Sequence, residues 1–227
     1  MTVLLHPHLE DMERRARQSL GVSSQAIYQM VSSALISRHA QGEMFLDIGC
    51  GAGNLFPFVR DSFQRYVGVD AVRYNGFPEG VDFVPADLDT DRLPLHDNST
   101  DAVAAVETIE HLENPRAFAR ELTRVTKPGG WIIVTTPNQL SLLSKVTLLL
   151  KNQFNAFQEG SYPAHLTALL EMDLRRIAGE CGWEDVAIFY SGQGRLALTS
   201  RNYPKFLSRV FPRACSDNIL IMGRKGA

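Results

Sequence analysis

The sequence predicts an α/β fold with a mostly parallel sheet that is covered by helices on both faces. Three observations predict it: strand-like apolar runs alternate with helix-like segments, a glycine-rich turn follows an early run, and 44% of the 227 residues are hydrophobic. Because parallel strands need crossover connections, helices are expected on both sides of such a sheet. The length suits one well-buried domain.

The first half of the predicted sheet contains three strands. Apolar runs at residues 44–48 and 66–70 flank a segment, 55–63, whose apolar spacing suits a helix, so the three form a β-α-β unit. Glycines and a proline within residues 71–80 predict that the next crossover helix is short or missing. A third strand is expected at residues 81–84.

The next two strands, at residues 101–106 and 131–136, are separated by a predicted helix over residues 115–126. Asn114 is suited to cap this helix, and the proline that follows is suited to the first helical position. The run Lys-Pro-Gly-Gly at residues 127–130 predicts a helix stop and a turn.

Beyond the fifth strand, the pattern predicts a helix at residues 171–181, a strand at 183–190, a helical excursion at 204–211 and a seventh strand at 218–223. The residues before them, at about 138–165, form an insertion whose apolar positions suit an amphipathic helix. A lid over a substrate is the favoured interpretation of this insertion. A plain core helix and a helix that contacts a lipid surface are the alternatives.

We divide the chain into an N-terminal helical cap, residues 1–40, and a main domain, residues 41–227. The cap is predicted from apolar residues at helical spacing, which are Leu20, Ile27, Met30, Val31, Ala34 and Leu35.

No apolar run approaches the length that crosses a bilayer, and the first residues lack the basic region and apolar core of a signal peptide. We therefore expect a cytoplasmic protein. Its three scattered cysteines predict neither a disulfide framework nor a zinc site.

The net charge of −2 conceals a basic C-terminal segment. Residues 191–227 carry seven basic groups and one acidic group, with aromatic residues between them. Such a segment can bind a phosphate backbone or an anionic lipid surface. It can equally be a solvated face that balances the acidic body of the chain.

Asp47 ends the first strand, and glycines follow it at positions 49, 51 and 53. Glycines at a strand-to-helix turn let a ligand approach the backbone closely. Dinucleotide sites use the different spacing G-x-G-x-x-G. Asp70 ends the second strand, where a carboxylate suits a ribose diol because it accepts two hydroxyl protons.

These motifs resemble those of class I S-adenosylmethionine (SAM) methyltransferases. The runs occur in the order that the family has: D-I-G-C-G-A-G-N at 47–54, G-V-D at 68–70, A-D-L at 86–88, V-E-T-I-E-H-L at 106–112 and R-V-T-K-P-G-G-W at 124–131. The resemblance implies a Rossmann-like, seven-stranded, mostly parallel sheet with an antiparallel last strand, and SAM as the cofactor.

The same resemblance implies roles for individual residues. The methionine part of SAM would be held by Asp47 with Gly49, Gly51 and Gly53, the ribose by Asp70, and the adenine by Asp87 with Leu88. Glu107, at the end of the fourth strand, joins this site by its position at the carboxyl edge of the sheet.

A second group of residues consists of Glu107, Glu110 and His111, with His165 much later in the chain. The first three would share one face of a helical turn, so the set predicts a site for a divalent cation such as Mg²⁺. The pattern E-x-x-E-H with a distant histidine resembles ubiquinone-pathway O-methyltransferases and the enzymes that methylate the 2′-hydroxyl at small-RNA 3′ ends. A cation there would lower the pKa of a substrate hydroxyl.

The alternative needs no metal. Glu110 would then brace a turn, and His111 or His165 would act alone as the catalytic base. In both cases we predict methyl transfer to a small-molecule acceptor at oxygen, with these two histidines as the catalytic residues.

Two other functions stay open at this point. A nucleic-acid methyltransferase would use the basic C-terminal segment to bind RNA, although the slightly acidic chain as a whole argues against it. A non-catalytic SAM-binding protein would keep the glycine loop and lack a positioned base.

Overall fold

The computed structural model of the chain describes residues 21–89 and 92–227. Its strands are β1 (Gly42–Ile48), β2 (Phe63–Asp70), β3 (Asp82–Pro85), β4 (Thr100–Val106), β5 (Thr126–Pro137), β6 (Trp183–Tyr190) and β7 (Asn218–Lys225). Its α-helices are α2 (Gln25–Ser37), α3 (Phe56–Val59), α4 (Pro115–Val125), α5 (Leu142–Lys151), α6 (Glu171–Glu180) and α7 (Lys205–Val210), and two short 3₁₀ turns are η1 (Ile109–His111) and η2 (Glu159–Ser161).

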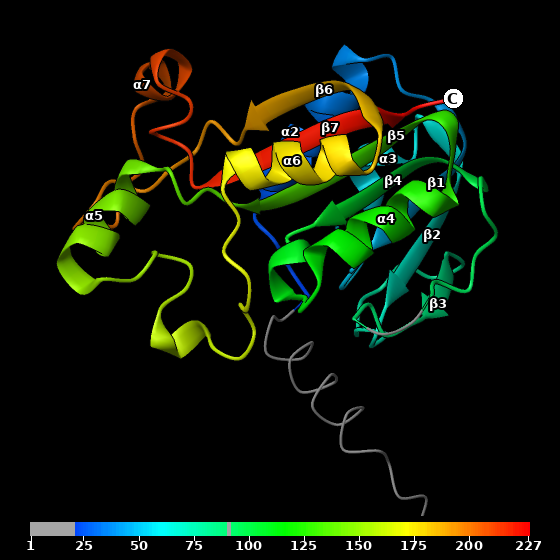
Figure 1. Cartoon of the computed structure of the whole chain (residues 1–227), viewed down its shortest axis with the longest axis horizontal. Coiled ribbons are helices and arrows are strands. Elements are labelled where there is room, and N and C mark those ends of the chain that lie inside the picture. Colours follow the sequence, from blue (N-terminus) through cyan, green and yellow to red (C-terminus); the bar gives the residue numbers. More distant parts are fainter. Residues whose placement is uncertain (1–20, 90–91) are drawn as a thin grey trace, which may run out of the picture.

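The strands form one seven-stranded sheet in the order β3-β2-β1-β4-β5-β7-β6 (Figure 1). β7 runs antiparallel to its neighbours β5 and β6, and the pairs among β1 to β5 are parallel. The predicted fold class and the antiparallel last strand are therefore confirmed.

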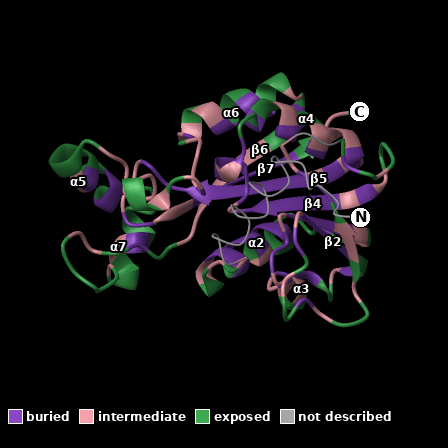
Figure 2. Ribbon diagram, turned by 90° about the horizontal axis from the view of Figure 1, so that it is seen from below, coloured by how far each residue is buried: buried purple, intermediate pink, exposed green. Residues whose placement is uncertain are grey.

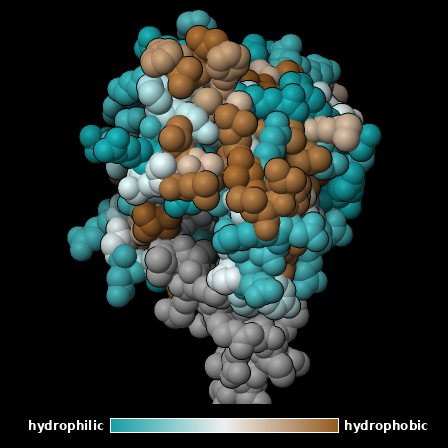
Figure 3. Space-filling view, turned by 90° about the vertical axis from the view of Figure 1, so that its left-hand side faces the viewer, coloured by the Kyte–Doolittle hydropathy of each residue, from teal (hydrophilic) through white to brown (hydrophobic). Residues whose placement is uncertain are grey.

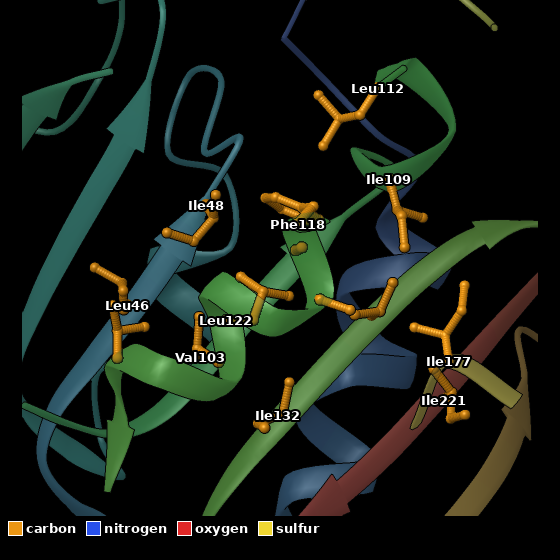
Figure 4. Packing of buried hydrophobic residues seen from close by; sticks show 14 of the residues in the cluster. Leu46, Ile48, Val103, Ile109, Leu112, Phe118, Leu122, Ile132, Ile177 and Ile221 are labelled. Atoms are coloured by element: carbon orange, nitrogen blue, oxygen red, sulfur yellow. The ribbon is translucent and has the colours of Figure 1, made fainter. Parts of the chain in front are cut away.

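Helices cover both faces of this sheet. On one face α4 and α6 share a buried cluster with Leu46, Val103 and Ile132 of the strands (Figure 4). On the other face α2 and the α3 region pack on Phe45 and Ile133 in a second cluster. Figure 2 shows the buried strands between these two layers. Buried residues of α2, such as Val31 and Leu35, are thus part of this second cluster.

Two predicted elements have different bounds in the structure. The helix predicted over residues 55–63 is only the single turn α3, because the chain soon enters the sheet, where Phe63 already pairs with Gly42. The turn predicted at residues 127–130 lies inside β5. Pairing with β4 shifts register there, from Thr126 opposite Thr100 to Trp131 opposite Ala102, so an irregularity within the strand absorbs these residues.

Other local predictions are confirmed. No helix or strand is assigned between Ala71 and Val81. The side chain of Asn114 caps α4 by accepting a hydrogen bond of 3.0 Å from the backbone N–H of Ala117. In α2, the buried residues include five of the predicted apolar positions, and Leu20 lies outside the described residues.

The insertion at residues 138–165 contains α5 and η2, and α5 and α7 both lie beyond the same end of the sheet (Figures 1 and 2). The backbone N–H of Leu142 donates to the carbonyl of Ala214, and the Asn138 amide donates to the carbonyls of Arg213 and Ser216. These bonds join the insertion to the segment that follows α7. Among the described helices, none is long and apolar enough to cross a membrane.

Candidate active site

A cavity of about 490 Å³ lies at the carboxyl ends of β1, β2 and β4, a size typical of small-molecule sites. The segment before α2 and the end of the insertion complete its wall. Eight of the residues nominated from the sequence line it: Gly49, Asp70, Asp87, Leu88, Glu107, Glu110, His111 and His165. Asp47, Gly51 and Gly53 do not line it.

The glycine loop, residues 49–53, shows why some nominated residues line the cavity and others do not. Its three glycines all have positive φ, at +70°, +51° and +74°. A Cβ on Gly51 would lie 2.1 Å from the carbonyl oxygen of Gly21, which accepts a hydrogen bond from the Ala52 N–H. A Cβ on Gly53 would lie 2.5 Å from Pro78. These two glycines therefore give room to other parts of the chain, and only Gly49 faces the cavity.

Asp47 lies behind the loop and is 2% exposed. Its Oδ2 accepts a hydrogen bond from the hydroxyl of Tyr66, and its Oδ1 has no partner among the described residues. Burial raises the pKa of Asp47 to about 7, against the opposing effect of the Tyr66 hydrogen bond. Asp47 is therefore a buried residue of β1 that joins β2 through Tyr66, and it does not line the cavity.

Asp70 connects the loop to the cavity. Its Oδ2 accepts a hydrogen bond of 2.9 Å from the Gly51 N–H, and its side chain lines the cavity. Burial raises the pKa of Asp70, while backbone N–H donors, Gly51 first, lower it. The carboxylate can still accept further hydrogen bonds, because each oxygen has two lone pairs.

Asp87 and Leu88 follow β3 and line the cavity next to Asp70. Asp87 is buried and accepts a hydrogen bond of 3.0 Å from the N–H of Asp89. Asp89 in turn accepts one of 2.7 Å from the N–H of Glu113, which fixes this loop against the start of α4. A buried carboxylate and a leucine thus lie beside each other in the cavity wall.

The two histidines nominated from the sequence meet at this cavity. Their ring centroids are 4.8 Å apart, although they are far apart in the chain. His111 donates from Nδ1 to the carbonyl of Ala164, and His165 donates from Nδ1 to the carbonyl of Ala156, over 2.6 and 2.5 Å. Nδ1 must be the donor in both, since a carbonyl oxygen only accepts. Each neutral ring then carries its lone pair on Nε2.

Glu110 completes this cluster. It is fully buried, and neither carboxylate oxygen has a hydrogen-bond partner within the described part of the chain. Burial, and secondarily the charge of Glu107, hold the pKa of Glu110 well above its usual range. Ligand atoms of Glu110, His111 and His165 all lie within 4.8 Å of one another.

Glu107 was predicted to join these three residues as a metal ligand, but it is not part of their cluster in the structure. Its carboxylate accepts hydrogen bonds from the Thr135 hydroxyl and the Asn218 amide, over 2.9 and 2.7 Å. Burial raises its pKa to about 7, and these two donors oppose the rise. The prediction assumed one helical turn from Glu107 to His111. Glu107 instead has φ of +50°, and η1 begins only at Ile109.

The sequence did not nominate several residues of the cavity wall. They are Ser23 and Ser24 ahead of α2, Tyr74 in the loop after β2, Thr108 and the η2 residues Gly160 and Ser161. Thr108 falls within the run V-E-T-I-E-H-L, whereas the others belong to no motif or periodic pattern, so only their place in the fold marks them.

The sheet order and a small-molecule cavity at the carboxyl edge define the chain as a Rossmann-like ligand-binding α/β protein. A family profile described as a methyltransferase domain matches residues 46–134. A relative from Mycolicibacterium smegmatis named as a probable S-adenosylmethionine-dependent methyltransferase is 28% identical over 193 residues, which are 84% of this chain and 71% of the relative.

More distant relatives include the mitochondrial ubiquinone biosynthesis O-methyltransferase of Dictyostelium discoideum, which is 27% identical over 56% of this chain and 44% of its own length. The chain thus spans less than half of that relative. A solved SAM-dependent methyltransferase from Archaeoglobus fulgidus has the same fold, with a TM-score of 0.61, 20% identity and coverage of 97% of this chain and 100% of that one.

A second solved structure, a SAM-dependent methyltransferase from Thermotoga maritima, has a TM-score of 0.64 and 18% identity over 96% of this chain and 95% of that one. Sequence motifs, family profile and fold agree. The chain belongs to the class I SAM-dependent methyltransferases.

Proposed function

We propose that this methyltransferase transfers a methyl group to an oxygen of a small-molecule acceptor, with His111 and His165 beside that oxygen. One observation carries the proposal: two imidazoles, each oriented by a backbone carbonyl, line the same cavity as Asp70 and Asp87. Imidazole is a base suited to a hydroxyl proton at neutral pH.

The residues present fit SAM. The buried Asp70 carboxylate, which keeps acceptor capacity, would hold the ribose, and Asp87 with Leu88 the adenine. Gly49 would lie under the methionine part of SAM, whereas Asp47 is buried and does not line the cavity. When bound, SAM supplies a methyl group on a positively charged sulfur, which needs an aligned nucleophile.

The chain's own residues then have two tasks. The cavity wall holds the acceptor hydroxyl in place, and Nε2 of His111 or His165 takes its proton as the oxygen becomes the nucleophile. The Ala164 and Ala156 carbonyls keep each ring in the tautomer that this task requires. Positive charge on either ring would be stabilised by these two carbonyl oxygens.

The position of Glu110 favours a second chemistry, in which a divalent cation assists methyl transfer. Two buried carboxylate oxygens without a hydrogen-bond partner, next to two imidazoles, make a donor set that fits a divalent cation. We propose this as the alternative to a lone base: the cation would be held by Glu110, His111 and His165, and would lower the pKa of the acceptor hydroxyl. Backbone carbonyls that orient both rings suit metal ligands as well as bases.

One set of variants tests the function and separates the two chemistries. The full chain is assayed for methyl transfer from SAM to a panel of phenols, catechols and short RNAs, with and without a chelator. We expect product methylated at oxygen, and a loss of about 100-fold or more in kcat for His111→Ala or His165→Ala. His96→Ala, an exposed histidine away from the cavity, is the control.

The lone-base chemistry predicts that a chelator has no effect and that Glu110→Gln keeps most of the activity. The cation chemistry predicts loss in both cases, with recovery of the chelated wild type on addition of Mg²⁺ or Mn²⁺. Methylation at nitrogen or carbon would contradict the proposal. Activity on RNA alone, or SAM binding without turnover, would favour the two other functions that the sequence left open. The cytoplasmic location expected from the sequence stays a proposal too.

A further inference from the structure

Exposed apolar side chains are concentrated at one end of the molecule. Of the twelve large hydrophobic residues that are exposed within the described residues, nine belong to residues 138–165 or 191–215. Seven of them lie on or next to α5 and α7, and we call them the α5–α7 surface: Leu142, Leu148, Leu149, Leu150, Phe206, Val210 and Phe211.

A surface helix usually buries its apolar face and exposes its polar face. In α5 and α7 this arrangement is largely reversed. α5 buries Leu143 together with the hydroxyl residues Ser144 and Thr147, while Leu149 is 84% exposed and Leu150 is 65% exposed. The buried hydroxyl of Ser144 accepts a hydrogen bond from the backbone N–H of Asn155, so polar contacts fix this orientation. α7 is similar, since it buries only Ser208 and exposes Phe206. The apolar faces of both helices therefore point outward.

The α5–α7 surface forms one region of the molecule. α5 and α7 lie together at the same end in both ribbon views (Figures 1 and 2). Seen from that end, hydrophobic residues gather on the surface and hydrophilic residues surround them (Figure 3). Contiguous apolar regions of this kind on a folded domain indicate a surface that contacts another phase or a partner.

The charge around this surface is positive. Residues 138–170 and 191–217 together carry seven basic and two acidic groups, although the whole chain has a net charge of −2. Lys145, Lys205 and Arg209 are exposed on the two helices, and none of the three forms an ion pair with a carboxylate of the described residues. An apolar centre with a basic rim is complementary to an anionic bilayer interface.

We propose that the α5–α7 surface binds an anionic lipid surface as a peripheral membrane contact. Leucine and phenylalanine side chains would enter the boundary between headgroups and acyl chains, and the lysines and arginines would lie at the headgroups. A second copy of the chain fits less well, because a symmetric pair would place two basic rims against each other. An acidic protein partner is the remaining occupant, and it would be favoured if the chain failed to bind anionic vesicles.

The proposal concerns a surface outside the cavity and is tested without substrate. The full chain is mixed with sedimenting vesicles of neutral phosphatidylcholine, or of the same lipid with about 30% phosphatidylglycerol. We expect binding to the anionic vesicles that is at least tenfold stronger than to neutral ones and that weakens as salt rises. The pair Leu149→Gln with Leu150→Gln should weaken binding at least tenfold, and so should Lys205→Gln with Arg209→Gln.

Matched controls remove exposed groups of the same kinds elsewhere. Ile36→Gln with Met172→Gln deletes two exposed apolar side chains off the surface, and Arg60→Gln with Arg92→Gln deletes two exposed cations. Neither pair should change binding. Absence of binding to anionic vesicles would overturn the proposal, as would equal loss in the control pairs. A wild-type dimer in solution that Leu149→Gln with Leu150→Gln converts to a monomer would also overturn it.

Discussion

Asp70 contacts both the glycine loop and the cavity. One carboxylate oxygen accepts a hydrogen bond from the Gly51 N–H, and the side chain also lines the cavity. Asp70→Ala should weaken binding of S-adenosylhomocysteine about 10- to 100-fold, since hydrogen bonds to a charged group contribute about 1.5–3 kcal/mol each. Titration calorimetry measures this. Asp61→Ala, at a side chain that is 93% exposed, should leave the affinity unchanged. Equal affinity in Asp70→Ala would remove Asp70 from the site.

Asp47 gives the fold a pH dependence whose sign follows from its pKa. That pKa is raised to about 7 in the folded protein, so the contribution of Asp47 to stability is fully present below its ordinary pKa and is lost as pH rises toward 7. Asp47→Asn stays neutral and can still accept from Tyr66. Its melting temperature relative to wild type should therefore rise between about pH 4 and pH 7, and level off above that.

The measurement is thermal unfolding of the ligand-free protein across this range. Asp61→Asn, on the surface, serves as the reference and should give a nearly constant difference. A constant difference for Asp47→Asn as well would show that Asp47 is ionised throughout.

At the scale of elements, the cap of α4 is a clear sequence prediction with a measurable contribution. Asn114 accepts from the Ala117 N–H, so Asn114→Ala should lower the free energy of unfolding by about 1 kcal/mol in urea denaturation. Ser24 precedes α2 and makes no side-chain cap hydrogen bond, so Ser24→Ala should cost clearly less. Similar losses in the two variants would mean that the cap does not stabilise α4.

The sequence predicted the positions of the strands but not the geometry of the turn after β4. Strand positions followed from apolar runs, and all seven strands are present. The turn from Glu107 to His111 was assumed to be helical, yet its geometry depends on the donors Thr135 and Asn218 from β5 and β7. Those strands are distant in the sequence, so no local pattern could place the Glu107 carboxylate.

At the scale of the whole molecule, β7 connects the two cores. Ile219 and Ile221 pack on the face that α4 and α6 cover, and Leu220 packs on the opposite face. Leu220→Ala should therefore lower the free energy of unfolding by about 2–5 kcal/mol through the lost burial and the cavity left behind. Leu149→Ala, the same change on the exposed α5–α7 surface, should cost less than about 0.5 kcal/mol. Urea unfolding checks both, and comparable losses would mean that Leu149 is covered in solution.

The candidate site also exists only at this scale. Its cavity combines Gly49 after β1, Asp70 at the end of β2, Glu110 after β4 and His165 from the insertion. Each was nominated from a motif or from its place at a strand end. Their meeting in one cavity required the parallel sheet, which brings the carboxyl ends of β1, β2 and β4 to one edge.

The sequence by itself determined the α/β class, the strand positions, the glycine loop and the acidic residues at the strand ends, because apolar periodicity and backbone requirements are local properties. Only the tertiary structure decided that Gly51 and Gly53 face other parts of the chain, that Glu107 leaves the Glu110–His111–His165 cluster, and that α5 and α7 turn apolar faces outward. Each of these depends on contacts between segments that are distant in the sequence. Such contacts are fixed by packing across the whole molecule, and local patterns do not record them.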